Sequence, residues 1–173
     1  MDITLFKAGL NEASLIYEMQ IKAFMPTFEK YQDYETSPAN EEVERTIERL
    51  NQATTDYYII KESNIPVGAI RIVRKENNTC RVSPIFILPE HQGKGIAQQV
   101  FLMIENTYNY AKRWELDTIL QEQGNCYLYN KIGYRKTGEI KQINDRMTIV
   151  FLEKKVNEQY SSARHHKVSL STA

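Results

Sequence analysis

The chain has 173 residues, of which 22 are basic and 22 acidic, so its formal net charge is zero. That length suits one domain with a sizeable core and leaves little room for two. The composition, 42% hydrophobic and 25% charged, is typical of a globular protein and excludes a disordered chain. Zero net charge argues against a general nucleic-acid binder, which normally carries a basic surplus.

Neither a membrane protein nor an exported protein is indicated. No apolar run approaches the roughly 18 residues of a membrane-spanning helix, and residues 1–10 lack the features of a secretory signal. Cys80 and Cys126 could form one disulfide at most, and without an export signal we expect free thiols. We therefore predict a cytoplasmic protein that does not bind membranes.

The first third of the chain predicts a strand and two helices. Residues 3–7 alternate as a short strand, and residues 11–24 carry apolar side chains at helical spacing. Residues 25–40 contain two prolines and a polar run, for which we expect a long loop. A second helix is expected over residues 40–52. Its buried stripe would consist of Val43, Ile47 and Leu50.

The middle of the chain changes to the period of strands. Residues 56–62, 67–75 and 79–88 are rich in Tyr, Ile and Val, and short turn-forming segments separate them. They predict an antiparallel meander of three strands. Pro84 cannot donate to a sheet ladder, so we expect a bulge or an unpaired stretch in the third of these strands.

The remaining elements follow in quick succession. We expect a helix over residues 94–112, a strand over 118–121, a helix over 125–132 that stops at Gly133, and a hairpin of residues 134–142 and 146–153. The fold class is α/β, with a mixed, mostly antiparallel sheet of about seven strands flanked by about four helices. Residues 1–155 would form the single domain.

The C-terminal residues 156–173 form a polar tail that we expect to be flexible. His165 and His166 lie in this tail, and no Cys or His cluster elsewhere would complete a metal site with them. We therefore predict no metal. The final hairpin, over residues 146–153, could pair with a second subunit, so a homodimer is possible.

The most informative segment covers residues 85–97, where an apolar strand ends at Pro89 and a turn with Gly93 and Gly95 opens into a helix. Backbone amides at a helix start lack internal acceptors and carry the positive end of the helix dipole. Glycines let a bulky anion approach them, and Lys94 adds charge. The turn therefore predicts a phosphate or pyrophosphate site, although a tight turn without a ligand is the alternative.

Two runs carry a family resemblance. Gln92-Gly93-Lys94-Gly95-Ile96-Ala97 fits the Q/R-x-x-G-x-G/A pattern of the GNAT superfamily of N-acetyltransferases. It is no dinucleotide fingerprint, since Gln98 replaces the third glycine. The run Leu128-Tyr129-Asn130-Lys131-Ile132-Gly133-Tyr134 is similar to the L-Y-E-K-x-G-F/Y run that closes the GNAT core. With the order of elements, the resemblance covers residues 3–154.

The resemblance implies acetyl-CoA as co-substrate and a primary amine as acceptor. The pyrophosphate of the coenzyme would lie on the turn formed by Gln92, Gly93, Lys94, Gly95, Ile96 and Ala97. Its pantetheine arm would lie between the strands that end at Leu88 and Gln121, against main-chain groups near Ile87. Asn125, which stands where the family often has alanine, is a further candidate for contact with the coenzyme.

The resemblance also implies direct attack of the amine on the thioester. Tyr129 matches the tyrosine that commonly protonates the departing sulfur, and a phenol with a pKa of about 10 suits that role. The alternative is a core tyrosine. Residues 81–88 lack the carboxylate that many relatives use as base. Glu122, where an asparagine is usual, could be the base, a ligand of the coenzyme arm or a solvated charge.

The acceptor is less defined. Residues 29–50 contain seven acids and three bases, and this acidic stretch could attract a cationic amine. Acids at the front of a helix are equally typical of an ordinary surface. Two further readings remain open: a non-catalytic acyl-CoA-binding module of the same fold, and an acyltransferase that uses another acyl group or a hydroxyl acceptor.

Overall fold

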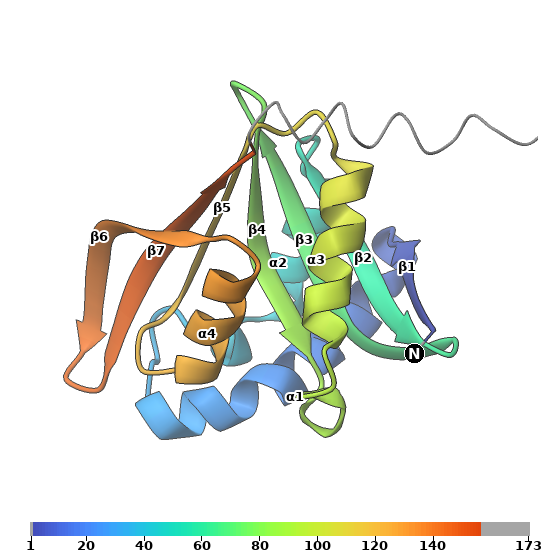
Figure 1. Cartoon of the computed structure of the whole chain (residues 1–173). Coiled ribbons are helices and arrows are strands. Elements are labelled where there is room, and N and C mark those ends of the chain that lie inside the picture. Colours follow the sequence, from blue (N-terminus) through green and yellow to red (C-terminus); the bar gives the residue numbers. More distant parts are fainter. Residues whose placement is uncertain (1, 157–173) are drawn as a thin grey trace, which may run out of the picture.

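In the computed structural model, which describes residues 2–156, seven strands form one sheet in the order β1-β2-β3-β4-β5-β7-β6 (Figure 1). All neighbouring strands run antiparallel except β4 and β5. The strands are β1 (Ile3–Lys7), β2 (Thr55–Glu62), β3 (Ile65–Lys75), β4 (Thr79–Ile87), β5 (Arg113–Ile119), β6 (Arg135–Asn144) and β7 (Met147–Lys155). The predicted fold class and the three-stranded meander are confirmed.

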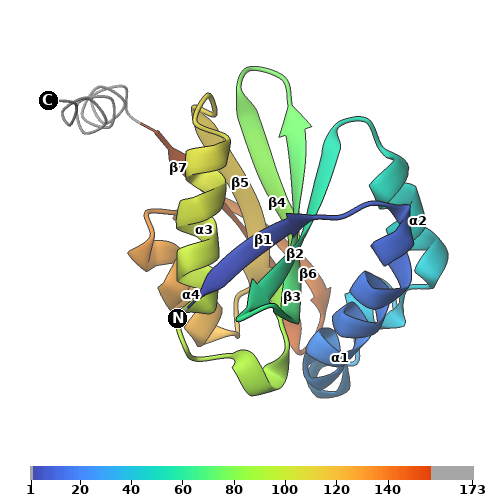
Figure 2. The same ribbon diagram turned by 90° about the vertical axis from the view of Figure 1, so that its right-hand side faces the viewer.

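Four helices cover the two faces of the sheet (Figure 2). They are α1 (Ala13–Tyr31), α2 (Val43–Asn51), α3 (Ile96–Thr107) and α4 (Gln123–Lys131). The apolar side of α3 and the ring of Tyr129 from α4 belong to one hydrophobic cluster. Ile16 and Met19 of α1 belong to a second cluster, with residues of β2, β3 and β4. The sheet is therefore buried on both faces, with one core on each side.

Helix α1 continues well beyond the predicted end, so the loop expected from residue 25 was wrong for residues 25–31. Pro26 lies inside the helix, where it removes one backbone donor. The helix nevertheless continues, because Phe24, Phe28 and Tyr31 keep the helical spacing of apolar side chains and Tyr31 is buried. It ends at Gln32, whose backbone is left-handed and whose N–H donates to the Phe28 carbonyl.

Helix α2 presents a different face from the one predicted. Ile47 is 37% exposed, whereas Thr46 is fully buried, and Leu50 packs beside the second cluster. The apolar stripe alone did not reveal that a polar side chain takes the inner position. The next helix and strand also differ from the prediction: α3 stops at Thr107, and β5 begins at Arg113, where Trp114, Leu116 and Thr118 alternate inward.

Strand β4 is irregular at the predicted place. Its register against β3 shifts by one residue between the Ile70–Ile85 and Ile72–Val82 pairs, opposite Pro84. Strand β4 pairs with β5 only over residues 79–81 and 113–115. Beyond these residues the two strands diverge (Figure 1), which opens the split between β4 and β5.

In the last hairpin, strand β7 lies between β5 and β6, so residues 146–153 cannot themselves take a strand from a second subunit. Strand β6 forms the edge of the sheet, and the possible homodimer stays a prediction. Cys80 and Cys126 are both free, as predicted. Within residues 2–156, no helix has the length and apolar character to cross a membrane. Apart from Val156, the predicted tail, with His165 and His166, lies outside the described residues.

Candidate active site

The turn before α3 has an unusual backbone. Gly93 and Gly95 have φ values of 73° and 81°, a region that residues with a side chain rarely adopt. Among residues 2–156, a Cβ atom built on either glycine would meet no atom within 4 Å, and no side chain caps the N-terminus of α3. The turn therefore offers open space in front of backbone amides, which fits a phosphate group.

Gln92 and Ile87 connect this turn to β4. The Gln92 side chain donates from Nε2 to the Ile87 carbonyl at 2.8 Å, and the Leu88 N–H donates to the Val67 carbonyl. These bonds fix the end of β4 against the turn. Lys94 is exposed beside the two glycines, while Ile96 is buried under α3 and anchors it. Ala97, the last residue of the motif, packs partly buried against the same core.

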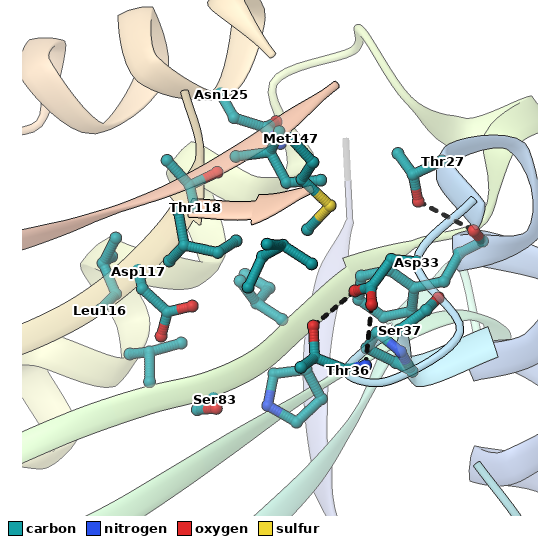
Figure 3. A pocket seen from close by; sticks show the side chains of 18 of the residues that line it. Thr27, Asp33, Thr36, Ser37, Ser83, Leu116, Asp117, Thr118, Asn125 and Met147 are labelled. Carbon is teal, nitrogen blue, oxygen red and sulfur yellow. Dashed lines mark hydrogen bonds between the residues drawn. The ribbon is translucent and has the colours of Figure 1, made fainter. Parts of the chain in front are cut away.

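A cavity of about 390 Å³ opens from the split between β4 and β5. Residues 81–85 of β4 and 116–119 of β5 form two of its walls. Residues of the α1–α2 connection and of the β6–β7 hairpin close it, and Asn125 and Tyr129 reach it from α4. Figure 3 shows Asp117 and Thr118 on one side of the cavity and Asp33, Thr36 and Ser37 on the other.

Tyr129 lies where helix α4 meets both the core and the cavity. Its ring packs edge-on against Phe101, at 5.8 Å between centroids, and near Tyr134. Burial raises the pKa of Tyr129, and the nearby Asp117 and Cys126 raise it further. The phenol therefore keeps its proton at neutral pH and can donate a hydrogen bond into the cavity.

Glu122 does not join Tyr129 at the cavity. It precedes α4, and its carboxylate accepts a hydrogen bond from Lys30 Nζ at 2.7 Å and one from the Tyr31 hydroxyl at 2.5 Å. These two bonds hold the pKa of Glu122 below its usual value. The residue is absent from the cavity lining and joins the end of α1 to the start of α4.

Asp117 is the site residue that sequence reasoning missed. It lines the cavity from β5, and its carboxylate forms an ion pair with Arg81 of β4 across the split. The available signal was the alternation of residues 113–119, in which Trp114 and Leu116 point to one face and Asp117 to the other. The predicted strand began at residue 118 and therefore left Asp117 out.

The acidic stretch presents few free carboxylates to the cavity. Of its seven acids, only Asp33 and Glu41 line it. Asp33 accepts hydrogen bonds from the Thr36 hydroxyl and from the backbone N–H groups of Glu35 and Thr36. Glu41 accepts two bonds from Arg49, each of 2.7 Å. Both carboxylates thus have their partners within the protein.

Comparison with known proteins identifies the family. Residues 26–156 match the model of the acetyltransferase (GNAT) domain, although no curated protein sequence matches. Three solved structures share the fold: the Escherichia coli ribosomal-protein-S18-alanine N-acetyltransferase, the Vibrio cholerae spermidine N-acetyltransferase with CoA and spermine, and a Bacillus anthracis protein described as a putative streptothricin acetyltransferase with acetyl-CoA.

The likeness to these structures extends over nearly the whole chain. The E. coli protein has 8% identity and a TM-score of 0.72, over 99% of this chain and 100% of that one. The V. cholerae protein has 16% identity and a TM-score of 0.70, over 88% of this chain and 95% of its own. The B. anthracis protein has 16% identity and a TM-score of 0.66, over 91% of this chain and 100% of its own. Because the family model covers most of the sequence, this chain belongs to the GNAT acetyltransferase family.

Proposed function

We propose that the protein transfers the acetyl group of acetyl-CoA to a primary amine, which attacks the thioester directly. The observation that carries this proposal is that Tyr129 lines the cavity that opens from the split between β4 and β5. A proton donor at the inner end of such a split can meet a thioester that enters along it.

The coenzyme would be held by the chain's own backbone. Amides of the turn from Gln92 to Ala97 would bind the pyrophosphate, since Gly93 and Gly95 leave the space before them open. Lys94 would add a positive charge beside it. The length of β4 that pairs with β3 but not with β5, up to Ile87, would flank the pantetheine arm, and Asn125 would contact the arm from α4.

The reaction moves protons between the amine, the thioester sulfur and side chains of the protein. As the amine nitrogen bonds to the acetyl carbon and the carbon–sulfur bond breaks, Tyr129 donates its phenolic proton to the departing sulfur. The substrate ammonium must first lose one proton, and the amine a second on attack. We assign Asp117 as the group that accepts the first, directly or through water, because it is the acid in the lining that also influences Tyr129. The second replaces the proton that Tyr129 gives to the sulfur, so the phenol is restored.

The neighbours support this chemistry by analogy. Solved structures of the same fold contain acetyl-CoA or CoA, one of them together with spermine. Asp117 takes the place of Glu122 in the proposal, because the Glu122 carboxylate is held by Lys30 and Tyr31 outside the cavity lining.

The test is release of CoA thiol from acetyl-CoA in the presence of a panel of amines, with the acetylated product identified by mass spectrometry. We expect thiol release that depends on both the protein and an amine. Tight binding of acetyl-CoA without thiol release for any amine would contradict the proposal and favour a binding module.

A further inference from the structure

A group of buried and partly buried polar side chains lies beside the cavity, between helices α1 and α2 and the sheet. We call it the arginine cluster. Its members are Gln20, Glu41, Thr46, Arg49, Tyr57 and Arg71. Glu41 and Arg49 line the cavity. Arg71 is not a lining residue itself, but its Nε donates a hydrogen bond to the carbonyl of Ser83, which is one.

The contacts bring these side chains together. Arg49 and Gln20 donate to the same oxygen of Glu41, at 2.7 and 2.8 Å. Thr46 lies one turn before Arg49 on α2. On the sheet, Tyr57 of β2 pairs directly with Arg71 of β3. Arg49 also influences the pKa values of both Tyr57 and Arg71, which places it near them.

The cluster has more positive charge than negative. Glu41 is its one acid, and it is already paired with Arg49 through two hydrogen bonds. In the described part of the chain, Arg71 has no ion pair with an acid, and its hydrogen-bond partners are Ser83 and Gln52. Burial and repulsion by Arg49 lower the pKa of Arg71 to about 10. The guanidinium nevertheless stays charged at neutral pH.

The cluster also has unused hydrogen-bonding groups. Among the described residues, two fully buried atoms have no partner: Gln20 Oε1 and Thr46 Oγ1. The Tyr57 hydroxyl interacts with Arg49. Gln20, Thr46 and Tyr57 are all at least 99% buried. A buried polar group without a partner costs roughly 1–3 kcal/mol. Water could satisfy such groups, but water would leave the positive charge uncompensated.

These observations point to an anionic ligand group at this end of the cavity. We propose that the amine acceptor also carries a carboxylate or phosphate, and that this group binds at the arginine cluster while the amine reaches Tyr129. The inference rests on the proposed function. A polyamine site would instead need free acids, but Asp33 and Glu41, the acids that line this end of the cavity, have partners within the protein.

Pairs of amines that differ by one charged group test the proposal. We would measure kcat/KM for L-lysine against cadaverine, 4-aminobutyrate against butylamine, and phosphoethanolamine against ethanolamine, with thiol release as readout. We expect the anionic member of at least one pair to be preferred by about tenfold or more, the gain of one charged hydrogen bond. The carboxylate and phosphate pairs show which anion is bound.

Variants at Arg71 separate recognition from structure. We expect Arg71→Met to reduce the preference to about one, and Arg71→Lys to retain part of it, since the charge remains. A cavity that is merely distorted would slow both members of a pair alike and keep their ratio. Arg113→Met is the control: Arg113 lies at the start of β5, pairs with Glu115 and Glu153 outside the cavity lining, and its loss should not change the ratio.

The outcomes are distinct. Equal or faster acetylation of the members that lack the carboxylate or phosphate would overturn the inference and leave the proposed function intact. A preference for the anionic member that is unchanged in Arg71→Met would do the same. Absence of thiol release from every amine in all pairs would overturn the proposed function, and the inference with it.

Discussion

Asp117 of β5 and Tyr129 of α4 line the same cavity, and the charge of Asp117 adds to burial in raising the pKa of Tyr129. This placement supports the proposal that Asp117 accepts a proton from the amine while Tyr129 donates one to the departing sulfur.

Replacing Asp117 by Asn should slow the reaction by about 10²- to 10⁴-fold, the range of general acid–base catalysis. The loss should appear in kcat/KM for the amine and leave acetyl-CoA affinity unchanged. Steady-state kinetics measure both. Glu115→Gln is the control, because Glu115 lies on the same strand and pairs with Lys75 and Arg113 outside the cavity lining. An unchanged kcat/KM in Asp117→Asn would contradict the proposed role of Asp117 as proton acceptor.

Gly95→Ala should weaken acetyl-CoA binding by more than tenfold. Its left-handed backbone disfavours a side chain by about 1–2 kcal/mol, and the new methyl group would enter the space before the amides of α3. Isothermal titration calorimetry measures the affinity. Gly138→Ala is a matched control, because Gly138 has a φ of 95° and open space on β6, far from the turn in sequence and sheet position. Equal losses of affinity in both variants would contradict the assigned site.

Asp56 should contribute to stability in a pH-dependent way. Burial alone would raise its pKa, but hydrogen bonds from Tyr108, Lys7 and Arg74 outweigh burial and hold the pKa below its usual value. Because the folded pKa is the lower one, this contribution is complete above pH 4 or so, the unfolded pKa. It is lost as the pH falls through the folded pKa.

The Asp56→Asn variant tests this relationship by denaturant unfolding at several pH values. We expect it to lower the free energy of unfolding at pH 7 by about 3 kcal/mol, as for a broken buried pair. Its stability should then fall less steeply than wild type below pH 4. Glu48→Gln, which removes an exposed pair with Arg45, should change stability by less than about 1 kcal/mol. If the free energy of unfolding depended on pH in the same way in Asp56→Asn and in the wild type, this role of Asp56 would be refuted.

Local patterns were enough to predict much of this fold. Alternating strands, the Pro84 irregularity and the turn at Gly93 and Gly95 all depend on neighbouring residues, and the structure contains each of them. The sequence predicts helix α1 too short because proline usually ends a helix, whereas Pro26 lies inside α1 and Tyr31 at its end is buried.

Residues that meet through tertiary structure could not be predicted in the same way. Glu122 meets Lys30 across 92 positions of sequence, and Arg71 joins Arg49 only when α2 lies on the sheet. Such long-range contacts produce no periodic pattern in the sequence. The role of Glu122 therefore remained open in the sequence, and the arginine cluster was not visible in it at all.

The central claim, that Tyr129 protonates the departing thiolate, is tested most directly by Tyr129→Phe. This change removes one hydroxyl and keeps the ring that packs on Phe101. We predict a fall in kcat of about 10²-fold or more, with acetyl-CoA affinity within twofold of wild type by calorimetry. A kcat equal to that of wild type, with the same affinity, would contradict the account.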